Sequence, residues 1–154
     1  TLRFIGDFAR RVAEDVAESL DRVRRPLFNL RLIGVSALGT KRPHAIVAMA
    51  EPTAALIELQ AEHERILQRI GLPPEGRKYT PHVTLARLRH GHPRHIAEYL
   101  TLRGGFFAQP FAVERFVLFS SRDSTGGGPY IAEETYDLSP PPAAPLEERP
   151  WPGS

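Results

Sequence analysis

The stretch Arg77-Lys78-Tyr79-Thr80-Pro81-His82-Val83-Thr84-Leu85-Ala86-Arg87 decides how the chain is interpreted. After the proline, the side chains of His82, Thr84 and Ala86 alternate with those of Val83, Leu85 and Arg87. This period of two predicts a strand that carries the histidine and the hydroxyl on one face of a sheet. A histidine can transfer protons near neutral pH, threonine adds a hydrogen bond, and arginine supplies a fixed positive charge suited to phosphate oxygens. A His-x-Thr triplet alone is weak, because three-residue patterns recur by chance.

Bulk composition is typical of a single soluble domain. The chain has 154 residues, of which 42% are hydrophobic and 25% charged, enough for a real core. The absence of cysteine excludes disulfides and thiolate metal sites and fits a reducing compartment. No apolar run is long enough to span a membrane, nothing at the start is typical of a signal peptide, and a net charge of +2 does not indicate DNA coating. We therefore expect a cytoplasmic monomer with no membrane segment.

The sequence before the central stretch predicts a strand, a helix, a hairpin and a second helix. The expected elements are a strand over 1–5, a helix capped by Asp7 and running to about Arg25, a hairpin of 28–38 (broken at Gly34) with 45–50, and a helix that starts at 51–53 and ends at Gly71. Pro52 is expected in the first turn of that second helix, where its missing N–H is harmless.

After the central stretch, a third helix and a second hairpin are expected. The helix covers about 93–102, and the hairpin joins a long strand over 111–120 to a strand over 130–138 through a glycine-rich turn. Proline dominates from residue 140 onward without apolar periodicity. We therefore expect one domain over 1–139 and, over 140–154, a tail that is disordered or weakly docked.

The order of elements forms two similar halves, each with a strand, a helix and a hairpin. Thr1-Leu2 and Thr84-Leu85 both precede a helix, and the run 29–33 parallels 113–117. Such halves are expected to pack with their sheets facing a shared cleft. If Thr1 corresponds to Thr84, the counterpart of His82 falls two positions before Thr1, outside this sequence.

Three stretches resemble the 2H phosphoesterases, and within them the RNA 2′,3′-cyclic phosphodiesterases that are also called 2′-5′ RNA ligase-like proteins. They are Thr1-Leu2-Arg3-Phe4-Ile5-Gly6, Pro81-His82-Val83-Thr84-Leu85-Ala86-Arg87, and Ser121-Arg122 through Gly126-Gly127-Gly128-Pro129-Tyr130. The resemblance covers nearly the whole chain up to Leu138 and implies a bilobal α+β fold. In that fold two pseudo-repeated halves carry antiparallel sheets that face a central cleft, with one His-x-Thr motif in each half.

The resemblance also assigns roles to individual residues. It makes Thr1 the threonine of the first motif, and His82 and Thr84 the histidine and threonine of the second. Arg87 would contact phosphate, and Phe4 would stack on a base, with Arg122 and Tyr130 on the substrate side of the cleft. The histidine of the first motif is not in the sequence, so either the sequence is part of a longer chain or the protein has a single catalytic histidine.

The activity that the resemblance implies is hydrolysis of an RNA or nucleoside 2′,3′-cyclic phosphate to the 2′-phosphate, without metal or cofactor. His82 would act as the base and the other histidine as the acid, or the reverse, and the reverse reaction would be 2′-5′ RNA ligation. RNA ends or nucleoside cyclic phosphates are the implied partners. Two alternatives stay open, namely a catalytically impaired RNA- or nucleotide-binding module on the same fold and a small-nucleotide cyclic phosphodiesterase.

Other polar and aromatic residues have plainer interpretations. His90, His92 and His95 are expected to be solvated histidines of a surface turn, since no carboxylate or cysteine stands at ligand spacing. His63 is expected to be a partly exposed helix residue. From the sequence alone Phe4 would be a core residue, Tyr130 is ambiguous, and the glycines at 126–128 fit a hairpin turn as well as a phosphate cradle.

Overall fold

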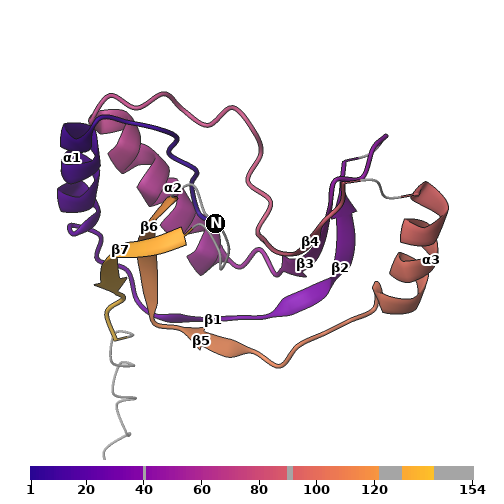
Figure 1. The fold of residues 1–154 in the computed structure, drawn as a ribbon. Coiled ribbons are helices and arrows are strands. Elements are labelled where there is room, and N and C mark those ends of the chain that lie inside the picture. The colour runs from indigo at the N-terminus through magenta and orange to yellow at the C-terminus, as the bar shows by residue number, and fades with distance from the viewer. Residues whose placement is uncertain (40, 90–91, 122–129, 141–154) are drawn as a thin grey trace, which may run out of the picture.

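The computed structural model describes residues 1–39, 41–89, 92–121 and 130–140 (Figure 1). Its helices and strands, in chain order, are α1 (Arg10–Leu20), β1 (Phe28–Leu30), β2 (Leu32–Leu38), β3 (Ala45–Ala50), α2 (Ala54–Arg69), β4 (His82–Arg87), α3 (Pro93–Arg103), β5 (Phe111–Val113), β6 (Arg115–Ser121) and β7 (Tyr130–Asp137).

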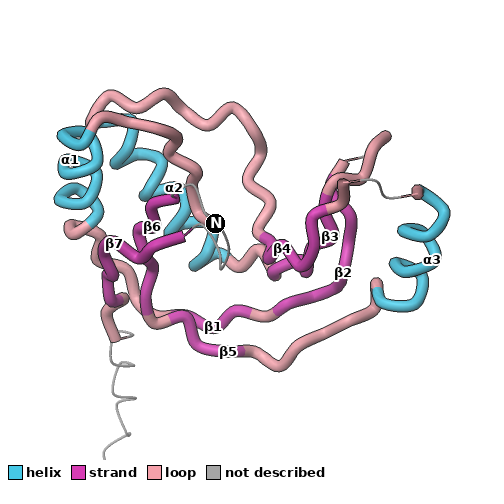
Figure 2. Tube along the Cα trace, in the orientation of Figure 1, coloured by secondary structure: helices cyan, strands magenta, loops and turns pink. Residues whose placement is uncertain are grey.

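The elements form two groups that are joined by a short crossing pair of strands. Helices α1 and α2 lie with β6 and β7, whereas β2, β3 and β4 lie with α3 (Figures 1 and 2). Strands β1 and β5 run between the groups, and all paired strands are antiparallel. The α+β class with antiparallel sheets is therefore confirmed, while the pseudo-repeat and the central cleft remain predictions.

The sheet of β2, β3 and β4 has a conformational requirement at Gly34. Its φ of +135° is unfavourable for residues with a side chain, and a Cβ there would approach the Gly104 carbonyl oxygen to 2.9 Å. Gly34 lies where the register of β2 on β3 shifts, between Leu32 and Val35. The strand thus continues through the glycine that the sequence marked as a break.

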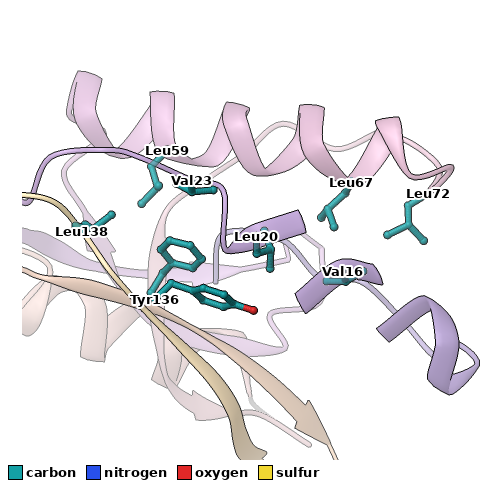
Figure 3. Packing of buried hydrophobic residues seen from close by; sticks show 9 residues of the cluster. Val16, Leu20, Val23, Leu59, Leu67, Leu72, Tyr136 and Leu138 are labelled. Carbon is teal, nitrogen blue, oxygen red and sulfur yellow. The ribbon is translucent and has the colours of Figure 1, made fainter. Parts of the chain in front are cut away.

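One hydrophobic core lies between the helices α1 and α2 and the hairpin of β6 and β7 (Figure 3). The Phe116 and Tyr136 rings stack with centroids 4.8 Å apart, and the Tyr136 hydroxyl donates to the Ala17 carbonyl at 3.0 Å. The buried members of this cluster are Val16, Leu20, Val23, Leu59, Leu67, Leu72, Phe116, Tyr136 and Leu138. In the other group β3 is the middle strand of its sheet, and all of its residues except Met49 are buried.

Helix ends were predicted better at α2 than at α1. Thr53 caps α2 by accepting from the Leu56 N–H at 3.4 Å, so Pro52 precedes the helix and is not in its first turn as predicted. Helix α2 ends at Arg69, followed by Gly71 at φ +93°, as the glycine predicted. The N-cap of α1 is Ala9, so the prediction of Asp7 as the cap was wrong.

Three strand predictions also need correction. Residues 1–5 are not a strand, because no described residue pairs with their backbone in a sheet. The predicted strands 28–38 and 111–120 each divide in two, at Arg31 and Glu114, because each chain segment changes its pairing partner there. Helix α3 and strand β7 occur where they were predicted.

The C-terminal part that is described ends in a docked segment. The Leu27 N–H donates to the Ser139 carbonyl at 2.8 Å, beside a parallel bridge between Pro26 and Ser139. The predicted tail lies outside the described residues except for Pro140. No described helix combines the length and the apolar character needed to cross a bilayer.

Arg25 joins the segment after α1 to α2 through two carboxylates. Its Nη1 lies 2.8 Å from Glu58 Oε2, and its Nε pairs with Glu62. Helix α1 ends at Leu20 and not near Arg25 as predicted, so Arg25 cannot serve the dipole of that helix. Its role is a partly exposed ionic link between the segment after α1 and helix α2.

His63 is buried in the core face of α2 and is not partly exposed as predicted. Only 4% of the residue is exposed, and its ring meets Phe116 edge to face with centroids 4.5 Å apart. Nδ1 donates to the Leu59 carbonyl at 2.8 Å, whereas Nε2 is buried without a hydrogen-bond partner. Burial lowers the pKa of His63, although the nearby Glu62 acts against this shift.

We expect replacement of Leu59 by alanine to destabilise the protein strongly. Leu59 is 2% exposed, and truncation of such a leucine typically costs about 2–5 kcal/mol through lost burial and a residual cavity. Ile57, which lies on the same helix and is 39% exposed, is the matched control, and Ile57→Ala should change the free energy of unfolding by about 1 kcal/mol or less. Urea denaturation measures both, and equal losses would contradict the assignment of the core.

We also expect His63 to lower the free energy of unfolding as the pH decreases below about 6.5, which is the usual pKa of histidine in an unfolded chain. Because burial lowers the pKa of folded His63, the unfolded state binds a proton first as the pH drops, with a slope of at most about 1.4 kcal/mol per pH unit. Urea denaturation at pH 7.5 and 5.5 should show this loss in the wild type and in His95→Gln, a control at an exposed histidine of α3. The His63→Leu variant should lack it, and an unchanged slope in that variant would refute the prediction.

Candidate functional site

His82 is half-buried at the start of β4, and a backbone hydrogen bond fixes its protonation pattern. Its Nδ1 lies 2.6 Å from the Thr80 carbonyl oxygen. A carbonyl can only accept, so Nδ1 carries the proton and the neutral ring keeps its lone pair on Nε2. Pro81, which is buried, joins these two residues, and its own carbonyl accepts from the Ala50 N–H at 3.0 Å. The loop and the strand edge therefore present His82 as a proton acceptor through Nε2.

Thr84 lies on the same face of the sheet as His82. The register pairs Met49 with His82, Ala48 with Val83 and Val47 with Thr84, without a shift between them. Residues i and i+2 of a regular strand point to the same side. Thr84 is exposed, so an imidazole and an accessible hydroxyl stand beside one another as predicted.

A β-bulge brings Arg87 to this same face, against the simple alternation expected from the sequence. Val47 pairs with Thr84, but Ile46 pairs with Ala86, so Leu85 is the extra residue of the bulge. Ala45 then pairs with Arg87, and Ala45 shares a face with Val47 because the two are separated by one residue on β3. The guanidinium therefore belongs with His82 and Thr84, and Ala86 belongs to the opposite face.

A hollow on the opposite face supports this assignment. About 540 Å³ of space between β4 and α3 is lined by Ile46, Leu85, Ala86, Leu88, His92, His95, Ile96 and Tyr99. Ile46, Leu85 and Ala86 thus face α3, while His82, Thr84 and Arg87 do not line this space. Val83 and Leu85 are 50% and 53% exposed, so the α3 side of β4 is only thinly covered.

The other residues of the predicted first motif lie in the N-terminal segment. Thr1 is exposed, and Phe4 is 70% exposed and is not the core residue expected from the sequence alone. Leu2 and Ile5 pack against the main core, and the Arg3 side chain bonds to the loop that follows α2. In Figure 1 the N-terminus lies between the two groups of elements. No hydrogen bond among the described residues joins the Thr1 and His82 side chains directly.

Tyr130 marks the end of the β6–β7 hairpin. It pairs with Ser121, is 64% exposed, and lies edge to face with Phe119 at a centroid distance of 6.4 Å. Arg122 and the predicted glycine-rich turn lie outside the described residues. Tyr130 is therefore an accessible aromatic, in a different element from the His82 face.

Among the described residues, His92 and His95 belong to no group of side chains that could hold a metal ion. The His92 and His95 rings lie 5.3 Å apart, and His92 Nδ1 accepts from the Arg94 N–H at 3.3 Å as the N-cap of α3. Within the described ranges no group of three histidine, cysteine or acidic side chains is placed to hold a metal ion. His90 lies outside those ranges.

Two features of the site were missed from the sequence. The bulge at Leu85 has no strong local signal, although the spacing of Thr84 and Arg87 by three residues could have indicated it once both were assigned to phosphate. The set of Arg3, Glu64 and Glu75 joins segments far apart in the chain. The sequence has no signal for this set, which is recognised in the structure from the ion pairs and the low exposure of the three side chains.

Comparison with known proteins places these residues in a family context. A family model described as LigT like Phosphoesterase matches residues 47–130, more than half of the chain. A curated protein of Aeropyrum pernix, named RNA 2′,3′-cyclic phosphodiesterase, is 37% identical over 91 residues, which cover 58% of this chain and 52% of that protein. The chain thus spans about half the length of the curated relative that it matches.

Solved structures share the fold. The crystal structure of Escherichia coli LigT complexed with 3′-AMP superposes with a TM-score of 0.70 at 24% identity, over 90% of this chain and 75% of that one. A crystal structure of a phosphoesterase gives a TM-score of 0.69 at 25% identity, with 90% and 75% covered. A Thermus thermophilus protein gives a TM-score of 0.74 at 24% identity, with 90% and 76% covered.

We expect neutral His82 to carry its proton on Nδ1. The hydrogen bond to the Thr80 carbonyl favours this tautomer over the one protonated at Nε2. Long-range ¹H–¹⁵N correlation spectra above pH 8 distinguish the two nitrogens, and the exposed His95 provides the reference for an imidazole in water. A proton on Nε2 of His82 would contradict the assignment.

Proposed function

The chain belongs to the LigT-like phosphoesterase family, and from this premise we propose that it hydrolyses RNA or nucleoside 2′,3′-cyclic phosphates to 2′-phosphates. This membership confirms the resemblance drawn from the three sequence stretches. The observation that carries the proposal is the shared face of β4, where His82, Thr84 and Arg87 combine a proton acceptor, a hydroxyl and a fixed positive charge. The name of the Aeropyrum pernix relative supports the same substrate class.

In the proposed reaction, His82 Nε2 accepts a proton from water as the water oxygen bonds to phosphorus. The bond from phosphorus to the ribose 3′ oxygen breaks, and that oxygen takes a proton from a general acid. The family resemblance assigns the acid to an imidazole two positions before Thr1. The reverse assignment of the two imidazoles is the alternative, and the hydrogen bond of Nδ1 to the Thr80 carbonyl, which leaves the lone pair of the neutral ring on Nε2, supports His82 as the base.

The developing negative charge requires donors on the non-bridging oxygens. Thr84 and Arg87 supply a hydroxyl and a guanidinium from one face of β4, and Thr1 is proposed to add a second hydroxyl from the N-terminal segment. Such donors act most strongly when they are held in place before the reaction. No step of this scheme needs a metal ion or a cofactor.

The base of the substrate is proposed to stack on an accessible aromatic ring. Phe4 is the first candidate because it is 70% exposed and three residues from Thr1, and Tyr130 and Arg122 are proposed as further contacts. RNA ends or nucleoside cyclic phosphates are therefore the proposed partners of a monomeric, cytoplasmic protein. The same groups run in reverse would join RNA ends through a 2′-5′ bond.

We expect hydrolysis of a nucleoside 2′,3′-cyclic phosphate to persist in a chelator and to depend on His82. The assay is made on the protein as its gene encodes it, in EDTA, with the printed 154-residue chain measured in parallel. Loss of a proton-transfer partner lowers kcat by roughly a hundred- to ten-thousand-fold, so His82→Ala should show a loss of this size. His95→Ala is the control and should keep the wild-type rate. Full activity of His82→Ala would refute the proposed role, and nucleotide binding without turnover in the wild type would favour the binding-module alternative.

We expect Arg87→Ala to raise KM more than Arg89→Ala. The register places Arg87 with Thr84, and a hydrogen bond to a charged group contributes about 1.5–3 kcal/mol, which corresponds to about a ten- to hundredfold change in affinity. Arg89 follows the strand and serves as the control of equal charge. Initial-rate kinetics measure both variants, and equal KM values would contradict the bulged arrangement.

A further inference from the structure

Arg3 makes an ionic and hydrogen-bonded link between the N-terminal segment and the loop after α2. Its side chain is only 11% exposed. Nη2 donates to the Pro73 carbonyl at 2.6 Å, Nη1 lies 3.5 Å from Glu75 Oε2, and Nε lies 2.7 Å from Glu64 Oε2 as an ion pair. One guanidinium therefore holds a loop carbonyl and two carboxylates at once.

The two carboxylates are held from their other sides. Glu64 Oε1 accepts from the Gln68 amide and from the Glu75 N–H, both at 2.8 Å. Burial would raise the pKa of Glu64, but these hydrogen bonds and the Arg3 charge outweigh it and lower the pKa. Glu75 accepts from Arg77 Nε at 3.1 Å, and hydrogen bonds from Arg77 lower the pKa of Glu75. Both acids thus stay charged at neutral pH, and Arg3 keeps its partners.

The position of this link in the chain gives it a consequence for the proposed site. Arg3 is two residues after Thr1 and directly before Phe4, and its Nη1 also donates to the Phe4 carbonyl at 2.6 Å. The loop that it holds continues to Thr80, whose carbonyl accepts from His82. Leu2 and Ile5 fix the segment to the core, but only Arg3 bonds it to this loop among the described residues.

We propose that Arg3 is a positioning residue that sets Thr1 and Phe4 relative to the strand that carries His82 and Thr84. This inference rests on the proposed function, because it assigns Thr1 and His82 to one phosphate. A partly buried arginine with two acids is weak evidence for stability, since apolar side chains often stabilise such a place equally well. Its geometric effect is specific, because Nη1 and Nη2 of the guanidinium donate in fixed directions to Glu75 and to the Pro73 carbonyl, while Nε lies beside Glu64 as an ion pair.

The test compares Arg3→Met with Arg25→Met in the protein as its gene encodes it. Arg25 also bonds two glutamates of α2 but belongs to no part of the proposed site. Misplacement of reacting groups by about 1 Å can cost about a hundredfold in rate, so Arg3→Met should lower kcat about ten- to a hundredfold with a smaller change in KM. Arg25→Met should keep kcat even if it unfolds more easily in urea. Arg3→Lys should recover only part of the rate, because an ammonium group lacks the fork.

A second measurement, by NMR, tests the effect of Arg3 on the strand without an activity assay. The amide resonances of residues 79–84 should shift in Arg3→Met and stay in place in Arg25→Met. A wild-type protein without hydrolysis would refute the proposed function, and these shifts alone would then decide whether Arg3 sets the strand that carries His82. Wild-type kcat in folded Arg3→Met, or unmoved resonances, would overturn the proposal. Arg3→Met leaves the Glu64 carboxylate without its ion-pair partner. If this variant folds poorly, the added Glu64→Gln replacement removes the unpaired charge and should restore stability. The kcat of the double variant should stay low.

Discussion

The arrangement of the protein depends on three residue pairs between β1 and β5. Phe28 pairs with Val113, Asn29 with Ala112, and Leu30 with Phe111. Because β1 continues into β2 and β5 continues into β6, each segment crosses from one group of elements to the other at this pair. Phe28 and Val113 also pack against the main core. A short antiparallel contact with an apolar anchor thus determines how the two groups are joined.

The sequence predicted those elements whose signals are local. The cap at Thr53, the stop at Gly71 and the alternation that starts at His82 each depend on a few neighbouring residues, and the helix and strand they indicate are present. The predicted strand over 1–5 failed because a strand exists only with a partner, and a partner is a long-range property. The same reason explains why 28–38 divides at Arg31, where the chain changes its pairing partner.

The candidate site was only partly predictable. The shared face of His82 and Thr84 follows from alternation, but the tautomer of His82 depends on the Thr80 carbonyl, which the sequence does not place. The face of Arg87 depends on the register with β3. The burial of His63 and the ion pairs of Arg3 likewise require knowledge of which segments meet. The sequence therefore shows which charged and proton-transferring side chains are present, whereas their relative positions depend on contacts between segments that are distant in the sequence.

The bulge at Leu85 explains the sequence spacing of the three side chains on the candidate face of β4. In a regular strand, three side chains on one face stand at even separations, so positions i, i+2 and i+5 cannot all share it. His82, Thr84 and Arg87 have this odd spacing, and one extra residue reconciles it with a single face. A third functional side chain at position i+5 reaches the face of positions i and i+2 only if the strand contains one extra residue, so this spacing itself predicts a bulge. Removal of the extra residue would leave Thr84 and the arginine two positions apart, so that a regular strand without a bulge would keep both side chains on one face.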